Sequence, residues 1–261
     1  MPTQTKNLVR LLKIMARLRA PDGCPWDREQ THASIRHNLV EETYEALDAL
    51  DTGDMVEFRD ELGDLLLQVV FHSQMASEAG TFDFDKVAKS IADKLIRRHP
   101  HVFGKAKAAT SAAVLQQWEA IKKKEKNAPS IVAEVPRGLP ALMRADKVQR
   151  KVARVGFDWK NVNGVIAKIE EELREVKAAL ASGRRRQLEE EVGDLLFAVV
   201  NLARFENLHA EDLLDRTVKK FVTRFQHIER AVHKSGRRLE DCTLAELDAL
   251  WESAKRRRLK R

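Results

Sequence analysis

The stretch LVEETYEALDALDTGDMVEFRDELGDLLLQVV, residues 39–70, has a similar counterpart later in the chain. It aligns without a gap to IEEELREVKAALASGRRRQLEEEVGDLLFAVV, residues 169–200, and 13 of the 32 aligned residues are identical. Self-similarity at a fixed offset is the sequence signature of repeated structural units. The sequence therefore predicts two tandem copies of one unit.

Landmarks outside this stretch repeat in the same order. The tryptophans pair at a spacing of 133 residues, Trp26 with Trp159 and Trp118 with Trp251. A Lys and an Arg four residues apart also occur in each half, at a spacing of 126. These pairs are Lys94 with Lys220 and Arg98 with Arg224. The changes of offset indicate short insertions in loops between duplicated elements.

A segment rich in charge and proline separates the two halves. It starts as a Lys/Glu run and continues to Pro136 and Pro140. Proline resists helix interiors because it lacks the amide proton. We predict an N-terminal unit over residues 1–122, a linker over 123–139, and a C-terminal unit over 140–261 that ends in a basic tail.

The spacing of apolar residues predicts helices. In the first half they recur three and four residues apart, which is the period of an amphipathic helix. These residues are Leu62, Leu65, Leu66, Val69 and Val70, and the second half repeats them as Val192, Leu195, Leu196, Val199 and Val200. Another helical pattern precedes each run and ends in a small residue followed by Gly53 or Gly183, which suits a helix C-terminus. Each half therefore predicts a helical hairpin, and the chain is predicted to be all-α.

Acidic residues fall at matching heights on the two arms of each predicted hairpin. Glu42 and Glu45 share one face of the first helix, and Glu61 and Asp64 share one face of the second. Glu45 lies 7 residues before Thr52 and Glu61 lies 9 after it. At a rise of roughly 1.5 Å per residue these two side chains oppose each other. The second half repeats the arrangement at Glu171, Glu172, Glu175, Glu191 and Asp194, with Glu41 as the further acid of the first half.

Several carboxylates on facing helices repel one another, so a positive charge has to compensate. Hard oxygen ligands of this kind suit Mg²⁺ or Mn²⁺, with water and phosphate oxygens completing the shell. A Glu-Glu-x-x-Glu pattern alone is typical of a solvated helix face. Because the duplication keeps all five acids while neighbouring surface residues diverge, we interpret the acids as a metal site.

Two glycines interrupt these helices at equivalent positions. Gly63 and Gly193 lie mid-helix, where Gly costs about 1 kcal/mol relative to Ala. Both copies keep the residue. We therefore expect a neighbouring helix to approach closely at this point.

These acids carry a resemblance to a known family. Glu41-Glu42-x-x-Glu45 followed by Glu61-x-Gly63-Asp64 resembles the signature of MazG-type nucleoside triphosphate pyrophosphohydrolases. The flanking GCPWD at 23–27, RRHPHVF at 97–103 and GFDW at 156–159 resemble the two-domain form, over about residues 7–255. The acid motif alone is shared with the wider all-α pyrophosphohydrolase superfamily.

The resemblance implies an all-α fold that dimerises, with helical bundles completed by the partner. It also implies Mg²⁺-dependent cleavage of nucleoside triphosphates, ATP among them, between the α- and β-phosphates. The products are a nucleoside monophosphate and pyrophosphate. Such chemistry needs charge neutralisation and an activated water rather than a protein nucleophile.

The motif match also implies roles for individual residues. The metal ligands are Glu172, Glu175, Glu191 and Asp194 in the second half and Glu41, Glu42, Glu45, Glu61 and Asp64 in the first. The catalytic set of the second half adds Glu171. The residues expected to bind substrate are Lys168, Lys220, Arg224 and Trp251, and in the first half Lys94, Arg97, Arg98 and Trp118. Ordinary core packing is an open alternative for Trp251.

The first half departs from the second at one position. Asn38 stands where the second half has Lys168, one turn before Glu172. This loses a positive charge near the expected phosphates. We therefore hypothesise that the second half is the main catalytic site.

Three alternative functions remain open at this point. A carboxylate-bridged di-iron bundle would need Glu-x-x-His on two helices, whereas both halves have Glu-x-x-Asp. A nucleotide-sensing protein without turnover would not need intact acids. Nucleic-acid binding would rest on the tail and on Arg184, Arg185 and Arg186, and we do not expect it because no aromatic stacking platform accompanies these charges.

Bulk composition limits the setting. The 261 residues carry a net charge of +7, and six positive charges lie in residues 255–261. The body of the protein is therefore nearly neutral. Cys24 and Cys242 form no motif, and no run of about 18 apolar residues is present to span a membrane. We expect a cytoplasmic protein without a membrane partner.

Overall fold

The computed structural model of the chain describes residues 4–125, 130–133 and 135–258. Every regular element in these ranges is helical, and no strand occurs within them. The prediction of an all-α fold is therefore confirmed. The chain divides into two compact units, Met1–Asn127 and Ala128–Arg261.

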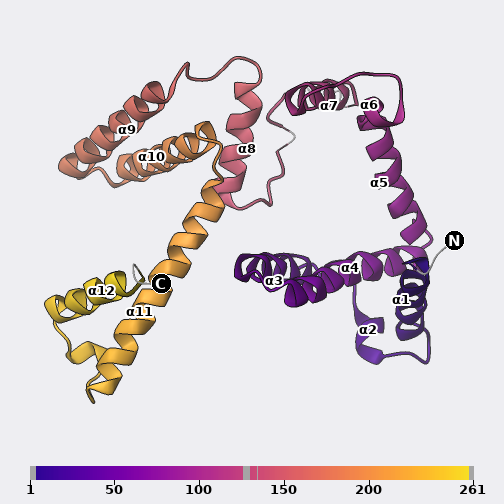
Figure 1. Cartoon of the computed structure of the whole chain (residues 1–261), viewed down its shortest axis with the longest axis horizontal. Coiled ribbons are helices and arrows are strands. Elements are labelled where there is room, and N and C mark those ends of the chain that lie inside the picture. The colour runs from indigo at the N-terminus through magenta and orange to yellow at the C-terminus, as the bar shows by residue number, and fades with distance from the viewer. Residues whose placement is uncertain (1–3, 126–129, 134, 259–261) are drawn as a thin grey trace. The chain divides into compact units, whose positions relative to one another are not determined.

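Unit 1 contains seven helices within its described residues, and the α3–α4 hairpin is the part that carries the acids (Figure 1). The helices are α1 (Gln4–Leu18), α2 (Pro25–Glu29), α3 (Asn38–Thr52), α4 (Met55–Glu78), α5 (Phe84–Arg98), α6 (Pro100–Phe103) and α7 (Ser111–Glu125). The predicted linker bounds, 123–139, stay a prediction, and residues 126–129 and 134 of that stretch lie outside the described part.

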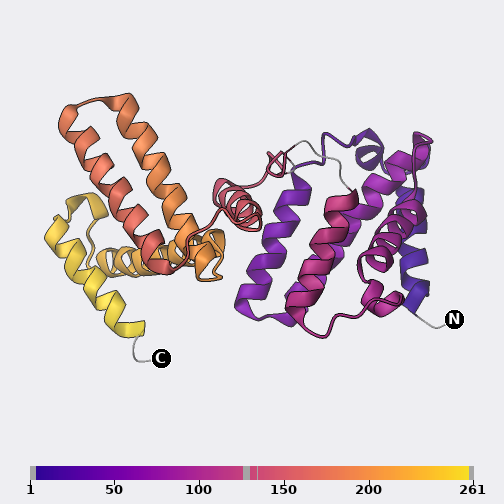
Figure 2. The ribbon, with the colours of Figure 1, turned by 90° about the horizontal axis from the view of Figure 1, so that it is seen from above.

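Unit 2 repeats this plan with the hairpin α9–α10, as both views show (Figures 1 and 2). Its helices are α8 (Ala141–Ala153), α9 (Val162–Ser182), α10 (Arg185–Phe205), α11 (Ala210–Lys234) and α12 (Leu244–Arg258), with a short 3₁₀ turn η1 (Leu239–Asp241) before α12. The end of the predicted basic tail, residues 259–261, lies outside the described part.

Both hairpins turn at the predicted glycine. Gly53 has a φ of 77° and Gly183 a φ of 67°, and the amide of each donates to the carbonyl three residues earlier. Only glycine adopts this left-handed conformation without steric cost. This turn sets the register of the two arms, and with it the height at which the acids face each other.

The core of unit 1 is a small apolar cluster at the end of α4 remote from this turn. Met15 of α1, Ile35 of the loop before α3, and Val70, Phe71 and Met75 of α4 are all almost fully buried. Burial of each such side chain stabilises the fold by roughly 1.5–3 kcal/mol. The cluster fixes α1 against α4 and leaves the α3–α4 arms to project from it.

In unit 2 small residues let α9 and α10 pack closely. Ala179 of α9 is 0 % exposed and Ala198 of α10 is 7 % exposed. The start of the hairpin is fixed by an ion pair, because Arg204 Nη2 lies 2.5 Å from Asp158 Oδ1. Arg204 holds the pKa of Asp158 below its usual value. Asp158 of the GFDW motif therefore has a structural role in positioning α10.

Large apolar side chains remain exposed along both hairpins. On α3 and α4 they include Tyr44, Leu47, Leu62, Leu66 and Val69, and on α9 and α10 they include Leu173, Leu180, Val192, Leu196 and Val199. Isolated exposed apolar residues are ordinary, but a row along one hairpin is typical of an interaction surface. Three of the five residues of each predicted apolar stripe are thus left exposed within the single chain.

The expectation of a close helix approach at Gly63 and Gly193 is wrong for the single chain. A Cβ atom added at either residue would meet no atom within 4 Å. The helices pack through other faces, and each glycine faces open space.

None of the helices in the described part of the chain combines the length and the apolarity needed to cross a lipid bilayer. The two cysteines, Cys24 and Cys242, are both free thiols. The fold is thus held by packing and ion pairs within each unit. Its stability should respond to changes at helix ends.

We predict that Asp54→Ala destabilises unit 1 by about 1 kcal/mol, because Asp54 is the N-cap of α4. Its Oδ1 accepts from the amides of Val56 at 2.9 Å and Glu57 at 3.1 Å. Urea unfolding followed by helical circular dichroism measures the loss. The matched control is Arg184→Ala, since Arg184 caps α10 without a side-chain cap bond and should cost little. Equal losses in the two variants would contradict the assignment.

Candidate functional site

The hairpin of unit 2 brings three acids together. Glu172 and Glu175 of α9 and Glu191 of α10 each offer a carboxylate oxygen, and these oxygens all lie within 4.8 Å of one another. Glu172 is only 5 % exposed, whereas Glu175 is exposed to solvent. The group is therefore buried at Glu172 and open to solvent at Glu175, which suits an ion that must also reach a substrate.

Unit 1 forms the equivalent group from Glu42, Glu45 and Glu61, again with oxygens within 4.8 Å. Glu61 Oε2 is buried and has no hydrogen-bond partner among the described residues. An unpaired buried carboxylate oxygen is costly unless a cation or a donor reaches it. The orphaned oxygen points to a ligand that binds at this place.

Electrostatic repulsion is visible in the pKa values of unit 1. Burial, followed by the charges of Asp64, Glu45 and Glu61, raises the pKa of Glu42 above its usual value. Burial and the charge of Glu45 raise the pKa of Glu61 in the same way. One donor works against this, because Gln68 Nε2 lies 3.4 Å from Glu42 Oε1. The fold thus disfavours full ionisation unless a cation is supplied.

Unit 2 supplies part of that charge itself. Lys168 Nζ lies 2.8 Å from Glu171 Oε1 and 2.7 Å from Glu172 Oε1. These two carboxylates raise the pKa of Lys168, so it stays protonated. Burial and a hydrogen bond shared with Glu172 still raise the pKa of Glu175. Asn38, at the equivalent position of unit 1, carries no charge to do the same.

The expected acids are not all equivalent. Asp64 acts on Glu42 through its charge but is not one of the three acids grouped in unit 1, and Glu41 lies outside the group as well. In unit 2, Asp194 is exposed and outside the group, while Glu171 faces Lys168. Each group thus has a three-acid centre and further acids at its edge.

The donor set fits a hard divalent cation. Three carboxylates converge in each unit, and no His belongs to either group. In unit 1, Glu61 Oε2 is buried without a hydrogen-bond partner among the described residues. Mg²⁺ is bound by a few carboxylates and keeps several waters for exchange with phosphate oxygens. The absence of His from the two groups speaks against a di-iron centre of the Glu-x-x-His type.

Two of the expected substrate-binding residues of each unit, an Arg and a Trp, form a second cluster. In unit 2 the Arg224 guanidinium lies 5.4 Å from the Trp251 ring, and Phe221 packs at 5.0 Å from the same ring. In unit 1 the Arg98 guanidinium lies 5.4 Å from the Trp118 ring. Each unit thus stacks an Arg on the face of a Trp ring at the same distance, so the duplication preserves this cation–π contact.

These clusters do not reach the acids within one chain. Among the described residues, no hydrogen bond or ion pair joins Lys220 or Arg224 to the acidic group of unit 2. Both views show α11 leaving the end of α10 and running away from the hairpin (Figures 1 and 2). Trp251 follows α11, because α12 packs on that helix. A single copy therefore holds the two halves of the expected site apart.

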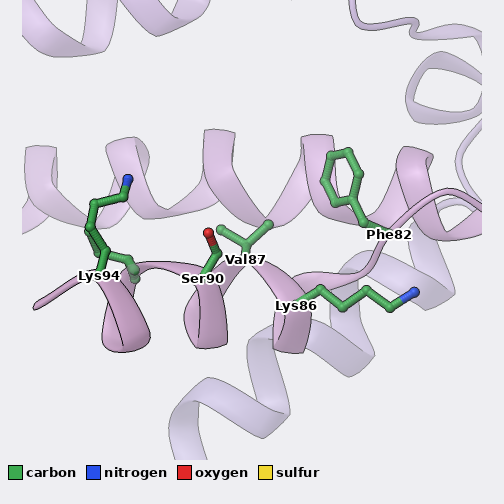
Figure 3. Close-up of a pocket in the computed structure, with 6 residues that line it drawn as sticks. Phe82, Lys86, Val87, Ser90 and Lys94 are labelled. Carbon is green, nitrogen blue, oxygen red and sulfur yellow. The ribbon is translucent and has the colours of Figure 1, made fainter. Parts of the chain in front are cut away.

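Lys94 of unit 1 lines an open groove of about 390 Å³ along one face of α5 (Figure 3). The lining residues are Phe82, Lys86, Val87, Ser90, Ile91 and Lys94. Arg97 lies outside this groove and contacts Glu125, with Arg97 Nε at 2.5 Å from Glu125 Oε1. Lys94 and Arg97, which are both expected to bind phosphate in unit 1, thus have different surroundings.

Three contributors escaped the sequence reasoning. Gln68 donates to Glu42, and Gln187 Nε2 lies 3.4 Å from Glu191 Oε1. Glu125 binds the arginines of unit 1. A signal existed for Gln187, which stands one helical turn before Glu191. Nothing in the pattern marked Glu125, because its partners lie 27 and 28 residues away.

Both acidic groups fall within a known domain. The family model of the MazG nucleotide pyrophosphohydrolase domain matches residues 30–103 and again residues 161–229. The chain belongs to the MazG family. The predicted duplication is therefore a duplication of the MazG domain, and the resemblance inferred from the acid motif is confirmed.

Similarity extends beyond the matched domains. The chain is 48% identical over 256 residues to the nucleoside triphosphate pyrophosphohydrolase of Escherichia coli K12, covering 96% of this chain and 97% of that protein. It is 47% identical over 247 residues to the nucleoside triphosphate pyrophosphohydrolase/pyrophosphatase MazG of Thermotoga maritima, covering 94% of each. An uncharacterized Bacillus subtilis protein is 44% identical over 245 residues, which is 50% of its own length. The matched region thus spans half of that relative.

We predict that Mg²⁺ stabilises the protein more as the pH rises from about 5 to about 8, because the folded state holds the pKa of several acids above that of the unfolded chain. Without a cation these acids make the fold less stable once the pH rises through their raised pKa values. A bound cation removes this penalty. The rise in Tm with Mg²⁺, measured by calorimetry across pH, tests the prediction.

The matched variant is Glu61→Gln/Glu191→Gln, which removes one acid from each group. It should raise the Tm of the metal-free protein at neutral pH and abolish the Mg²⁺ effect. KCl at equal ionic strength serves as the salt control. A Tm rise with Mg²⁺ that does not change with pH would speak against metal binding by these acids.

Proposed function

We propose that this MazG-family chain hydrolyses nucleoside triphosphates to nucleoside monophosphates and pyrophosphate with the help of Mg²⁺ or Mn²⁺. The observation that carries the proposal is the convergence of Glu172, Glu175 and Glu191 within 4.8 Å, on a hairpin that also positions Lys168. The relatives named as nucleoside triphosphate pyrophosphohydrolases match nearly the full chain, which supports the same reaction.

The roles of the side chains follow from their charges. When bound, the divalent cation neutralises phosphate charge and lowers the pKa of water. Glu172, Glu175, Glu191 and Asp194 would hold it, and one carboxylate would accept the proton of the attacking water. The water oxygen bonds to the α-phosphorus while the bond to the α–β bridging oxygen breaks. Pyrophosphate then leaves.

Phosphate and base recognition fall to the second cluster of unit 2. Lys220 and Arg224 would bind the triphosphate, since guanidinium and ammonium groups pair with phosphate oxygens. Trp251 offers a ring face to base or sugar. Arg224 Nε is buried and lacks a hydrogen-bond partner among the described residues, so a donor is available for an anion.

Unit 2 is the proposed main catalytic site. It has Lys168 where unit 1 has Asn38, and its Arg224 retains a free donor. Unit 1 keeps the acids but lacks both features. A nucleotide-sensing role without turnover is therefore the alternative that unit 1 alone supports.

A homodimer would complete the site. The acids lie on α9–α10 and the cations on α11, and α11 diverges from the hairpin within one copy (Figures 1 and 2). The hairpins also expose apolar rows that a second copy would cover. We propose that the α11–α12 arm of one copy supplies Lys220 and Arg224 to the acids of the other. Nucleotide substrates and the free thiols Cys24 and Cys242 fit a cytoplasmic setting, in nucleotide-pool housekeeping or control of a signalling nucleotide.

Incubation of the purified protein with each common NTP and dNTP, with Mg²⁺ and with EDTA, tests the reaction. Monophosphate plus pyrophosphate, abolished by EDTA, is the expected result. Diphosphate plus orthophosphate would mean that the wrong bond is cleaved and would overturn the proposal. Nucleotide binding with Mg²⁺ but no products would favour the sensing alternative.

The assignment of the main site predicts unequal effects of matched variants. Glu172→Gln/Asp194→Asn should lower kcat by at least about 100-fold, because metal-assisted water activation is lost. Glu42→Gln/Asp64→Asn makes the same change in unit 1 and should retain most of the activity. Initial rates of pyrophosphate release measure both. The reverse ranking would place catalysis in unit 1.

A site shared between copies predicts complementation. Asp194→Asn and Arg224→Gln proteins should each be nearly inactive alone. When they are mixed and allowed to exchange subunits, about one quarter of the sites regain both partners, since an exchanged C₂ dimer holds one intact site. Activity that stays at the level of the separate variants would show that each copy builds its own site.

A further inference from the structure

Glu125, the last residue of α7, bridges the two arginines of unit 1. Arg97 Nε lies 2.5 Å from Glu125 Oε1, and Arg98 contacts Oε2 through Nε at 3.0 Å and Nη2 at 2.5 Å. The Arg98 and Glu125 side chains are only 13 % and 19 % exposed. Charge-assisted bonds of this geometry are among the stronger polar contacts in proteins.

The equivalent guanidinium in unit 2 keeps one donor unpaired among the described residues. Arg224 occupies the position of Arg98 and stacks on its tryptophan at the same 5.4 Å, yet its Nε is buried without a hydrogen-bond partner among the described residues. The position of Glu125, counted from the tryptophan, is taken by Arg258 in unit 2, and the position of Arg97 is taken by Thr223. Within the described part of the chain, Arg98 thus has a carboxylate on its Nε and Arg224 does not.

We propose that Arg97, Arg98 and Trp118 form a polyphosphate-binding site in unit 1 that Glu125 closes from within. The carboxylate uses the donors that phosphate oxygens would use, because both present paired oxygens to the flat edge of a guanidinium. A polyphosphate ligand binds by displacing Glu125. That the natural ligand is a nucleotide rests on the proposed function, whereas the anion site itself does not.

Charge favours such an exchange. Arg97 and Arg98 both contact Glu125, whose single charge balances only one of these two cations. An anion that carries several charges reduces the repulsion between these cations more than one carboxylate does. A polyphosphate therefore competes well with Glu125, while a single-charge anion gains little.

Acidification does not open the site. The hydrogen bonds from Arg98 and Arg97 lower the pKa of Glu125 to about 2. The carboxylate stays ionised at every pH that a cell offers, so only a competing anion releases it.

Calorimetric titration of the full-length protein with inorganic tripolyphosphate in EDTA tests the closure. All proteins carry Arg224→Gln so that unit 2 does not add to the signal. Addition of Glu125→Gln should tighten binding by about tenfold or more, because the internal competitor loses its charge. Further addition of Arg98→Gln should cancel that gain. The assay needs neither metal nor turnover, so its failure is separate from a failure of the proposed reaction.

Glu78→Gln is the matched control, because it also removes one arginine-paired carboxylate from unit 1, at the contact with Arg19. It should leave tripolyphosphate binding unchanged. A gain of less than twofold with Glu125→Gln, or an equal gain with Glu78→Gln, overturns the proposal. If Glu125→Gln fails to fold by circular dichroism, Glu125→Asp replaces it, since the shorter acid should close the site less well and still tighten binding. An Asp variant that binds no tighter than its parent likewise overturns the proposal.

Discussion

In each unit two antiparallel helices hold three carboxylates with oxygens within 4.8 Å of one another, and their repulsion has to be offset for the hairpin to keep its shape. The two units compensate this repulsion differently. Unit 2 places Lys168 against Glu172, whereas unit 1 leaves Glu61 Oε2 buried and unpaired. Burial concentrates the repulsion, because charges interact more strongly where water is excluded. The turn glycines and the small residues between the arms serve this arrangement by fixing the height and the distance of the acids.

The two faces of the hairpin impose different requirements on the surroundings. The acidic face needs a cation and access for phosphate, and the apolar face needs cover that the single chain does not provide. The divergence of α11 from α10 separates the arginine–tryptophan cluster from the acids, so both requirements point to a second copy. The duplication then allows one fold to serve two purposes. Unit 2 keeps its guanidinium available, and unit 1 closes its own with Glu125.

Much of this could be predicted from the sequence because it depends on local periodicity. The all-α fold, the duplication and the glycine turns follow from residue spacing, and the structure confirms them. The convergence of Glu45 with Glu61 follows from counting residues on either side of the turn. The position of Asp64 and Asp194 outside the three-acid groups could not be predicted in this way, because it depends on how the arms twist. The closed arginines of unit 1 also could not be predicted, since the bonds to Glu125 span an intervening helix and loop. The open space at Gly63 and Gly193 depends likewise on packing that no local pattern describes.

We propose that the acids of each hairpin hold a divalent cation directly. Crystals of the protein grown with Mn²⁺ test this through the anomalous scattering of the metal. We expect a peak within direct coordination distance of Glu172, Glu175 and Glu191, at about 2–2.5 Å from carboxylate oxygens. A peak elsewhere, or none at these acids while Mn²⁺ supports turnover, would contradict it.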